Sequence, residues 1–206
     1  MKRTGVFDRL YLAGGTAIAV HLHHRRSIDL DLFSLTPELD LESLADQLRK
    51  EGATTIALGD ATLSLRIGNV PIDIVRYPYA PVTAFERGPE DVRLASLREL
   101  AAMKLSAIAR RGIRRDFWDL YAIIESGAVT LARALDDYTT KFGVARSDVY
   151  HVLRALLWFE EAEQDVMPRG MTTKHWQQIR AWYERVAALE LVRRAQTRPR
   201  SLKKHR

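Results

Sequence analysis

A short apolar run that stops at a pair of glycines constrains the fold of this chain more than any other feature. Residues 10–13 read Leu-Tyr-Leu-Ala and are followed by Gly14-Gly15, a pattern that predicts a buried strand ending at a turn. Residues 17–24 then predict a short helix, with Thr16 as its capping residue. Glycine lets the backbone approach a ligand closely and a helix N-terminus offers free N–H groups, so this junction suits a phosphate.

The segment that follows, residues 27–33, alternates apolar and acidic side chains. The apolar set is Ile28, Leu30 and Leu32, and the acidic set is Asp29 and Asp31. This two-residue period predicts a strand with one apolar face and one face that carries both carboxylates. A later predicted strand, residues 70–76, contains a further acid, Asp73, between apolar neighbours.

The remaining pattern divides the chain into a sheet-rich part and a helical part. A helix is predicted from Thr36-Pro37-Glu38 to Gly52, and strands over residues 54–58, 62–67 and 70–76. Helical periodicity then predicts helices over residues 94–109, 114–125, 131–141, 147–163 and 172–194. We therefore expect an α+β (α/β-like) fold, with a small mixed sheet domain at 1–90, a helical bundle at 91–197 and a basic tail at 198–206.

Three aspartates beside a glycine turn favour a divalent-metal site. Mg²⁺ prefers oxygen ligands and usually takes a few carboxylates, completing its shell with water and substrate phosphates. Asp29, Asp31 and Asp73 are therefore candidate ligands for Mg²⁺ or Mn²⁺ beside a Gly14-Gly15 phosphate loop. Each feature alone has a structural interpretation, because Gly-Gly pairs are common in turns and acidic strand faces are commonly only solvated. Their combination in this order favours function.

Composition excludes several classes of site and leaves the partner open. The chain has no cysteine, which excludes disulfides and thiolate metal sites and fits a cytoplasmic protein. No apolar run approaches the ~20 residues that span a bilayer, and the weak signal-peptide pattern at the start is broken by charges and by the glycines. Residues 1–97 carry 11 Lys/Arg against 13 Asp/Glu, and residues 98–206 carry 21 against 13. The basic second half is as consistent with a solvated face as with an anionic partner.

Two segments carry a family resemblance. Residues 11–34, from the glycine pair to the Asp-Leu-Asp-Leu strand, resemble the signature of DNA polymerase β-type nucleotidyltransferases, and more closely that of the AbiEii/AbiGii toxin family. Residues 99–112, with Lys104, and residues 115–121, with Asp116, resemble that family's later motifs. The resemblance implies a nucleotidyltransferase sheet domain and a toxin of a type IV toxin–antitoxin or abortive-infection system.

The resemblance also implies roles for individual residues. Gly14, Gly15 and Thr16 would hold the triphosphate, and the three aspartates would bind the metal. Lys104 would contact a nucleotide phosphate, Asp116 would support activity, and Asp119 is a weaker candidate. The alternative interpretations are an exposed helix lysine, and salt bridges from the two acids to Arg110, Arg111 or Arg114.

The implied partners are an NTP, an acceptor and an antitoxin, with no membrane. The acceptor is open between RNA (a tRNA), a protein hydroxyl and a small molecule. Two alternatives stand beside the toxin: a non-catalytic nucleotide-binding module, supported by the few residues before the first strand, and a transferase acting on an aminoglycoside-like molecule.

Other polar and aromatic residues are expected to have structural or solvent roles. His21, His23 and His24 lack metal-site spacing and are expected at polar helix positions, and Arg25 and Arg26 are expected in solvent, with a nucleotide contact as the alternative. The tryptophans are expected in the helical core rather than as base-stacking platforms. They are Trp118, Trp158, Trp176 and Trp182.

Overall fold

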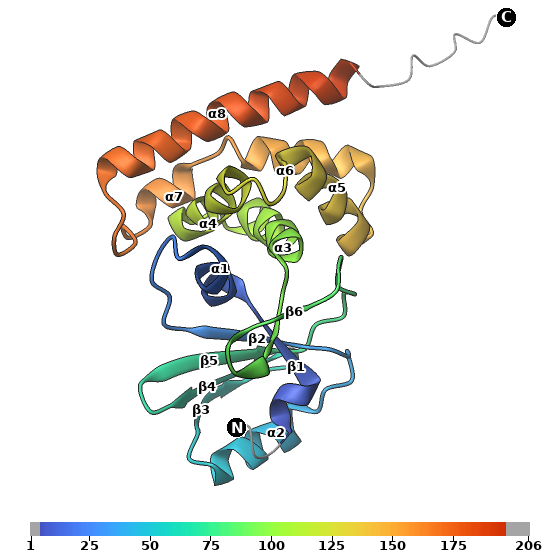
Figure 1. The fold of residues 1–206 in the computed structure, drawn as a ribbon, viewed down its shortest axis with the longest axis vertical. Coiled ribbons are helices and arrows are strands. Elements are labelled where there is room, and N and C mark those ends of the chain that lie inside the picture. Colours follow the sequence, from blue (N-terminus) through green and yellow to red (C-terminus); the bar gives the residue numbers. More distant parts are fainter. Residues whose placement is uncertain (1–4, 197–206) are drawn as a thin grey trace, which may run out of the picture.

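A central mixed sheet and a layer of helices stacked on one of its faces make up the fold (Figure 1). The computed structural model describes residues 5–196. Its strands are β1 (Leu10–Ala13), β2 (Leu30–Ser34), β3 (Thr54–Leu58), β4 (Thr62–Ile67), β5 (Val70–Val75), β6 (Glu86–Arg87) and β7 (Arg93–Leu94). They are ordered β3-β4-β5-β2-β1-β7-β6 in the sheet. The expected sheet followed by helices is therefore observed.

The helices fall into two groups. Two belong to the first half of the chain: α1 (Gly14–Leu22) and α2 (Leu41–Lys50). The others are α3 (Leu97–Arg110), α4 (Arg114–Glu125), α5 (Leu131–Phe142), α6 (Val149–Ala155), α7 (Glu160–Gln164) and α8 (Thr173–Gln196), with 3-10 turns η2 (Val6–Arg9), η3 (Pro89–Asp91) and η4 (Arg146–Asp148). Figure 1 shows α1 between the sheet and the later helices, with α2 on the other side of the sheet.

The centre of the sheet sets the register on which the site depends. β2 lies between β1, with which it is antiparallel, and β5, with which it is parallel. In that parallel pairing Asp31 is directly opposite Asp73, and Leu32 is opposite Ile74. Leu32 and Ile74 are buried, as the alternating strand pattern requires.

Several element boundaries differ from the sequence-based expectation, among them the start of α3, which is Leu97 rather than Leu94 because residues 93–94 form β7. Helix α1 begins at Gly14, so Thr16 lies inside it and Ala13 is the N-cap residue. Helix α2 begins only at Leu41, because the Asp40 carboxylate accepts hydrogen bonds from the N–H groups of Glu42 and Ser43. Strand β2 begins at Leu30, which leaves Ile28 exposed.

A larger difference is found in the segment predicted as one helix over residues 147–163. It is divided into η4, α6 and α7. The break occurs where the Phe159 ring packs 5.2 Å from Phe117 and 6.0 Å from Trp176, centroid to centroid. Burial of this aromatic side chain in the helical core outweighs local helical periodicity.

The sheet also extends beyond the predicted sheet segment. The short strand β7 pairs with β1 in parallel, through Leu12 and Leu94. It comes just before α3, which begins at Leu97. Two-residue strands lack enough periodicity to be read from sequence. Within residues 5–196, no helix combines the length and apolar character needed to cross a membrane. The predicted basic tail lies outside the described residues.

Candidate active site

Two carboxylates stand side by side at the centre of the sheet. Asp31 on β2 and Asp73 on β5 are register partners on adjacent parallel strands, which are spaced about 4.8 Å apart in sheets. Directly paired residues project from the same face, so the two side chains lie on one face of the sheet, with Asp31 the more buried and Asp73 exposed. The hydroxyl of Ser64, on β4, donates a hydrogen bond of 2.5 Å to Asp73 and orients its carboxylate.

Gly14 packs directly against Asp31. A Cβ atom at position 14 would lie 1.8 Å from Asp31 Oδ2 and 2.6 Å from its Cγ, and the residue has a φ of +64°. Only glycine allows both this backbone conformation and this approach. The Asp31 carboxylate therefore lies against the first residue of α1, whose N-cap residue Ala13 makes no side-chain capping bond.

The pKa of Asp31 is raised by burial first, and then by the negative charges of Asp29 and Asp73, while Lys104 opposes the shift. Two neighbouring carboxylates that repel one another favour binding of a cation between them. Asp31 and Asp73 together line a cavity of about 860 Å³. The opposite walls of this cavity come from α3, α5 and α6.

Asp29 lies near this pair but faces a different cavity. It precedes β2 and lines a second cavity of about 290 Å³ together with Arg25 and Arg115. Burial acts to raise the pKa of Asp29, but hydrogen bonds from its own backbone and from Ser27 lower it overall. Among residues 5–196, no three His, Asp or Glu side chains form a cluster that holds a metal as it stands. The structure thus brings Asp31 and Asp73 together and leaves Asp29 beside them.

The proposed phosphate loop is connected to the Asp29 segment. The hydroxyl of Thr16 donates a hydrogen bond to the carbonyl of Asp29. Gly15 is buried, and a Cβ atom there would lie 2.3 Å from Nη2 of Arg25. Glycine at this position lets a guanidinium pack onto the first turn of α1.

Arg25 differs from the expectation that it is solvated. Its side chain is 6% exposed, and its Nε and Nη2 donate to the two oxygens of Asp119 at 2.6 and 2.8 Å. His24 contacts the same carboxylate, with Nε2 2.7 Å from Oδ1. These contacts join residues about 94 positions apart, so no local sequence signal indicates them.

Lys104 is buried rather than exposed. Its Nζ lies 2.8 Å from Asp116 Oδ1 and 2.8 Å from Asp119 Oδ2, and both acids are buried. Burial acts to lower the pKa of Lys104, but Asp119 and Asp116 raise it overall, so the ammonium keeps its charge. The alternative interpretation of Lys104 as an exposed helix lysine is wrong.

The two acids of α4 are the centre of this ion cluster. Asp116 also pairs with Arg111, at 3.2 Å, which is one of the salt bridges considered from the sequence. Asp119 pairs with Arg25, His24 and Lys104, and these three partners hold its pKa below the usual value even though burial acts to raise it. Asp119, the weaker candidate by sequence, therefore links α4 to the first turn of α1.

The tryptophans divide three to one. Trp118, Trp176 and Trp182 are buried, as expected, and Trp158 is 56% exposed, contrary to expectation. Of the three histidines near α1, His21 lies with Nε2 2.8 Å from the Ala95 carbonyl, and His23 is exposed.

Comparison with known proteins identifies a family. The family model described as Nucleotidyl transferase AbiEii toxin, Type IV TA system, matches residues 1–64 and 55–197. An uncharacterized protein of Aquifex aeolicus (strain VF5), aq_aa25, is 25% identical over 184 residues, which cover 88% of this chain and 87% of that protein.

Solved structures bear on the fold alone. The crystal structure of JHP933 from Helicobacter pylori aligns with a TM-score of 0.50 at 14% identity, covering 92% of this chain and 88% of that one. The antibiotic-resistance factor ANT(2'')-Ia aligns with a TM-score of 0.37 at 17% identity, covering 90% and 88%, which is too loose a match to support an argument.

Proposed function

The chain belongs to the AbiEii family of nucleotidyl transferase toxins of type IV toxin–antitoxin systems, and from this membership we propose that it transfers a nucleoside monophosphate from an NTP to an acceptor hydroxyl with Mg²⁺ or Mn²⁺. Nucleotidyl transfer is the activity of the family. The metal, the acceptor and the roles of individual residues are our proposal for this chain.

One observation carries the proposal: the Asp31–Asp73 pair against Gly14. Two carboxylates in register on adjacent strands meet the uncapped start of a helix, where a glycine leaves no side chain in the way. A helix start binds phosphate oxygens and carboxylates bind divalent metal, so this junction suits a metal–triphosphate complex.

The donor set fits a divalent ion that shares its shell with the substrate. Asp31 and Asp73 would hold it, with Asp29 joining from the neighbouring cavity, and the raised pKa of Asp31 from burial and from Asp29 and Asp73 supports a cation there. When bound, the metal would neutralise charge on the phosphates and orient them. Fewer than three preformed ligands is consistent with Mg²⁺, which completes its shell from water and substrate phosphates.

The chain's own residues would supply positioning and a proton acceptor. The acceptor oxygen would bond to the α-phosphorus, the bond from that phosphorus to the β-phosphate oxygen would break, and pyrophosphate would leave. Asp73, oriented by Ser64, would take the hydroxyl proton. Gly14, Gly15 and Thr16 would receive the triphosphate at the start of α1.

The cationic residues near Asp31 would complete phosphate binding. Lys104 lies close enough to lower the pKa of Asp31 against burial, and Arg25 is held against Gly15 by Asp119. We propose Lys104 and Arg25 as the positive charges nearest the triphosphate, with Asp116 and Asp119 positioning them. Charge neutralisation of this kind is the main catalytic contribution in phosphoryl transfer.

We propose RNA, such as a tRNA, as the acceptor, and an antitoxin as the protein partner. The excess of positive charge in the second half of the chain supports RNA, and family membership supports the antitoxin. A cognate antitoxin would be recognised as a protein that suppresses growth inhibition by this chain.

The test is transfer of label from α-³²P-labelled NTPs, with Mg²⁺, to total RNA, to total protein and to an aminoglycoside in separate reactions. The wild type is compared with Asp31→Asn and Asp73→Asn, and with Asp46→Asn as a control. Asp46 is an exposed acid of α2 that pairs with Arg49, so its loss removes a carboxylate without touching the site.

We expect RNA labelling that is lost in both site variants and kept in the control. Labelling of the aminoglycoside alone would replace RNA with a small molecule as the acceptor. Binding of NTP in a calorimeter without transfer to any acceptor would refute catalysis and favour the non-catalytic module.

A further inference from the structure

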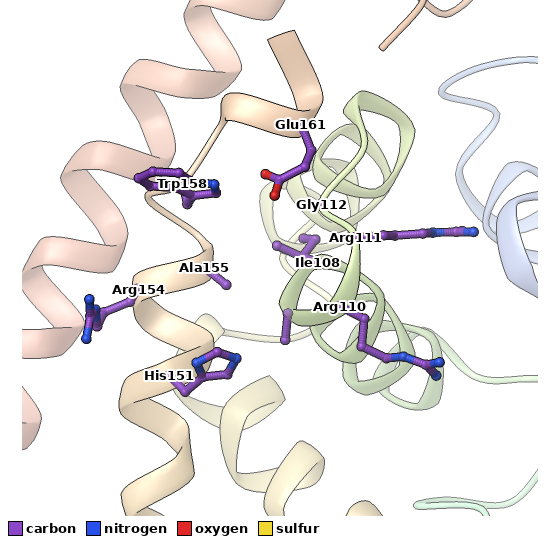
Figure 2. Close-up of a pocket in the computed structure, with 10 residues that line it drawn as sticks. Ile108, Arg110, Arg111, Gly112, His151, Arg154, Ala155, Trp158 and Glu161 are labelled. Atoms are coloured by element: carbon purple, nitrogen blue, oxygen red, sulfur yellow. The ribbon is translucent and has the colours of Figure 1, made fainter. Parts of the chain in front are cut away.

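A third cavity lies on the helical side of the molecule, between the end of α3 and α6. It has a volume of about 310 Å³ (Figure 2). In this view His151 and Glu161 point into the space, and the Trp158 ring lies at its edge. Arg110 and Arg111 extend from the end of α3 toward the side opposite α6. We call this cavity, lined by these five side chains among others, the outer cavity.

The outer cavity borders the cavity that contains Asp31 and Asp73. The two share four lining residues: Ala109, Arg110, Arg111 and His151. Because the shared residues lie at the edge of both cavities, a chain bound in the outer cavity would cross the end of α3 to reach the other. It would arrive on the side of Asp73 rather than on the side of Asp29, which lines a separate cavity.

The charged residues at this junction suit an anion. Arg110, Arg111 and Arg154 are among the residues that line the outer cavity, with their side chains directed outward from its centre in Figure 2, and Glu161 is the only carboxylate among its described lining residues. Arg110 is exposed and makes no side-chain hydrogen bond or ion pair with any residue in the range 5–196. By contrast, Arg98 of α3 pairs with Asp137, and the buried Arg114 of α4 pairs with Glu163. A guanidinium left unpaired at the mouth of a predicted catalytic cavity suits a phosphate.

Aromatic rings are available along the same path. Trp158 is 56% exposed, whereas the other three tryptophans are at most 7% exposed. In the cavity that contains Asp31 and Asp73, Tyr79 is 41% exposed, and its ring lies 4.8 Å from that of Phe142, centroid to centroid. Exposed aromatic faces beside cationic side chains are the features with which proteins bind single strands, because an unpaired base can stack on them.

We propose that Arg110, His151 and Trp158 form a binding track for a single-stranded nucleic acid, whose end enters the cavity of Asp31 and Asp73. Arg110 contacts a phosphate and Trp158 stacks on an unpaired base. The strand is single because a base within a duplex has no free face for Trp158. The proposal rests on the proposed function for the identity of the reaction but not for binding.

The experiment measures binding of a fluorescein-labelled 12-nucleotide single-stranded RNA to the full chain by anisotropy, without NTP. The variants are Arg110→Gln and Trp158→Ala, and the matched control is Arg185→Gln. Arg185 is an exposed arginine of α8 that lines neither cavity and has no side-chain partner within the described residues. An RNA duplex of the same sequence is measured in parallel.

We expect Trp158→Ala to weaken binding about 5- to 150-fold, the range for loss of one base–aromatic stack. Arg110→Gln should reduce the slope of log affinity against log salt by about 0.7, as loss of one phosphate contact does for single strands. Arg185→Gln should bind like the wild type. Because Trp158 is the exposed tryptophan, the RNA should also quench intrinsic fluorescence in the wild type and much less in Trp158→Ala.

Three results would overturn the track: wild-type affinity in both variants, an equal loss in Arg185→Gln, or equal binding of the duplex. Transfer to RNA at the wild-type rate in both Trp158→Ala and Arg110→Gln would also overturn the track, and the proposed function would stand. Variant-sensitive RNA binding without transfer to any acceptor would support the track and refute the proposed function. Transfer to protein in a chain that binds no RNA would refute the track and assign a protein acceptor.

Discussion

Replacement of Gly14 by alanine tests the contact between α1 and the carboxylate pair. The new Cβ would lie 1.8 Å from Asp31 Oδ2, whereas Cβ atoms essentially never approach another atom within 3.0 Å. The Asp31 carboxylate must therefore retreat by about 1 Å, and a misplacement of that size at a reacting centre lowers rates by about 100-fold. The φ of +64° adds strain of about 1–2 kcal/mol for alanine.

The two effects are separated by measuring transfer and stability together. Strain of that size lowers the melting temperature by about 2–8 °C in a chain of this length. Gly68→Ala is the matched control, because Gly68 has a φ of +56° in the turn between β4 and β5 and a Cβ atom there would have nothing within 4 Å. It should melt like Gly14→Ala and transfer label like the wild type.

Equal transfer rates in Gly14→Ala and Gly68→Ala would refute the argument from steric overlap. Isothermal titration calorimetry with Mn²⁺ measures metal affinity directly and needs no acceptor. Weaker Mn²⁺ binding in Gly14→Ala alone is expected, because the displaced carboxylate is a proposed metal ligand.

Three further variants test the ion cluster, the carboxylate pair and a helix cap. Asp119→Asn should lower the free energy of unfolding by about 3–5 kcal/mol at pH 7, because it leaves Lys104 and Arg25 with less compensation. The folded-state pKa of Asp119 is lowered by Lys104, Arg25 and His24 against the effect of burial, so its contribution is present above about pH 4 and is lost as the pH falls through the folded pKa. Asp31→Asn should melt above the wild type at pH 7 while transfer falls at least 100-fold, because burial and two neighbouring acids raise its pKa and make the ionised form destabilising. Asp40→Ala should cost about 1 kcal/mol through loss of the α2 cap, with transfer unchanged.

Each of these variants has an outcome that contradicts the reasoning. Urea unfolding that gives Asp119→Asn the wild-type free energy at pH 7 would show that its ion pairs contribute no net stability. A lower melting temperature in Asp31→Asn would show that its charge is compensated rather than repelled. Loss of transfer in Asp40→Ala would place α2 in the site, which its position on the other side of the sheet argues against.

The elements that local pattern specifies were predictable. Strands β1, β3 and β4 and helix α4 have the bounds expected from sequence, because a strand-like run bounded by turn residues, or helical periodicity, extends through their full length. Strands β6 and β7 and the break between α6 and α7 were not, because two-residue pairings and the burial of Phe159 depend on distant parts of the chain.

The candidate site divides in the same way. Gly14, Asp31 and Asp73 are recognisable because each sits in a local pattern, and the family match agrees with the resemblance of those segments. The roles of Arg25 and His24 cannot be recognised from sequence, since these residues contact Asp119, which lies about 94 residues later in the chain. Trp158 has the local sequence context of any helical tryptophan, and only packing leaves it exposed.

The chain of amino acids by itself determined the order of the longer strands and helices, the glycine turn, and the places of Asp31 and Asp73 within strands, since these follow from periods of two and 3.6 residues and from backbone freedom. Only the tertiary structure decided that β5 pairs beside β2 with Asp31 opposite Asp73, that Lys104 is buried between two acids, and that one tryptophan faces solvent. Those outcomes depend on which surfaces pack together, and packing is a competition among all parts of the chain rather than a property of any one segment.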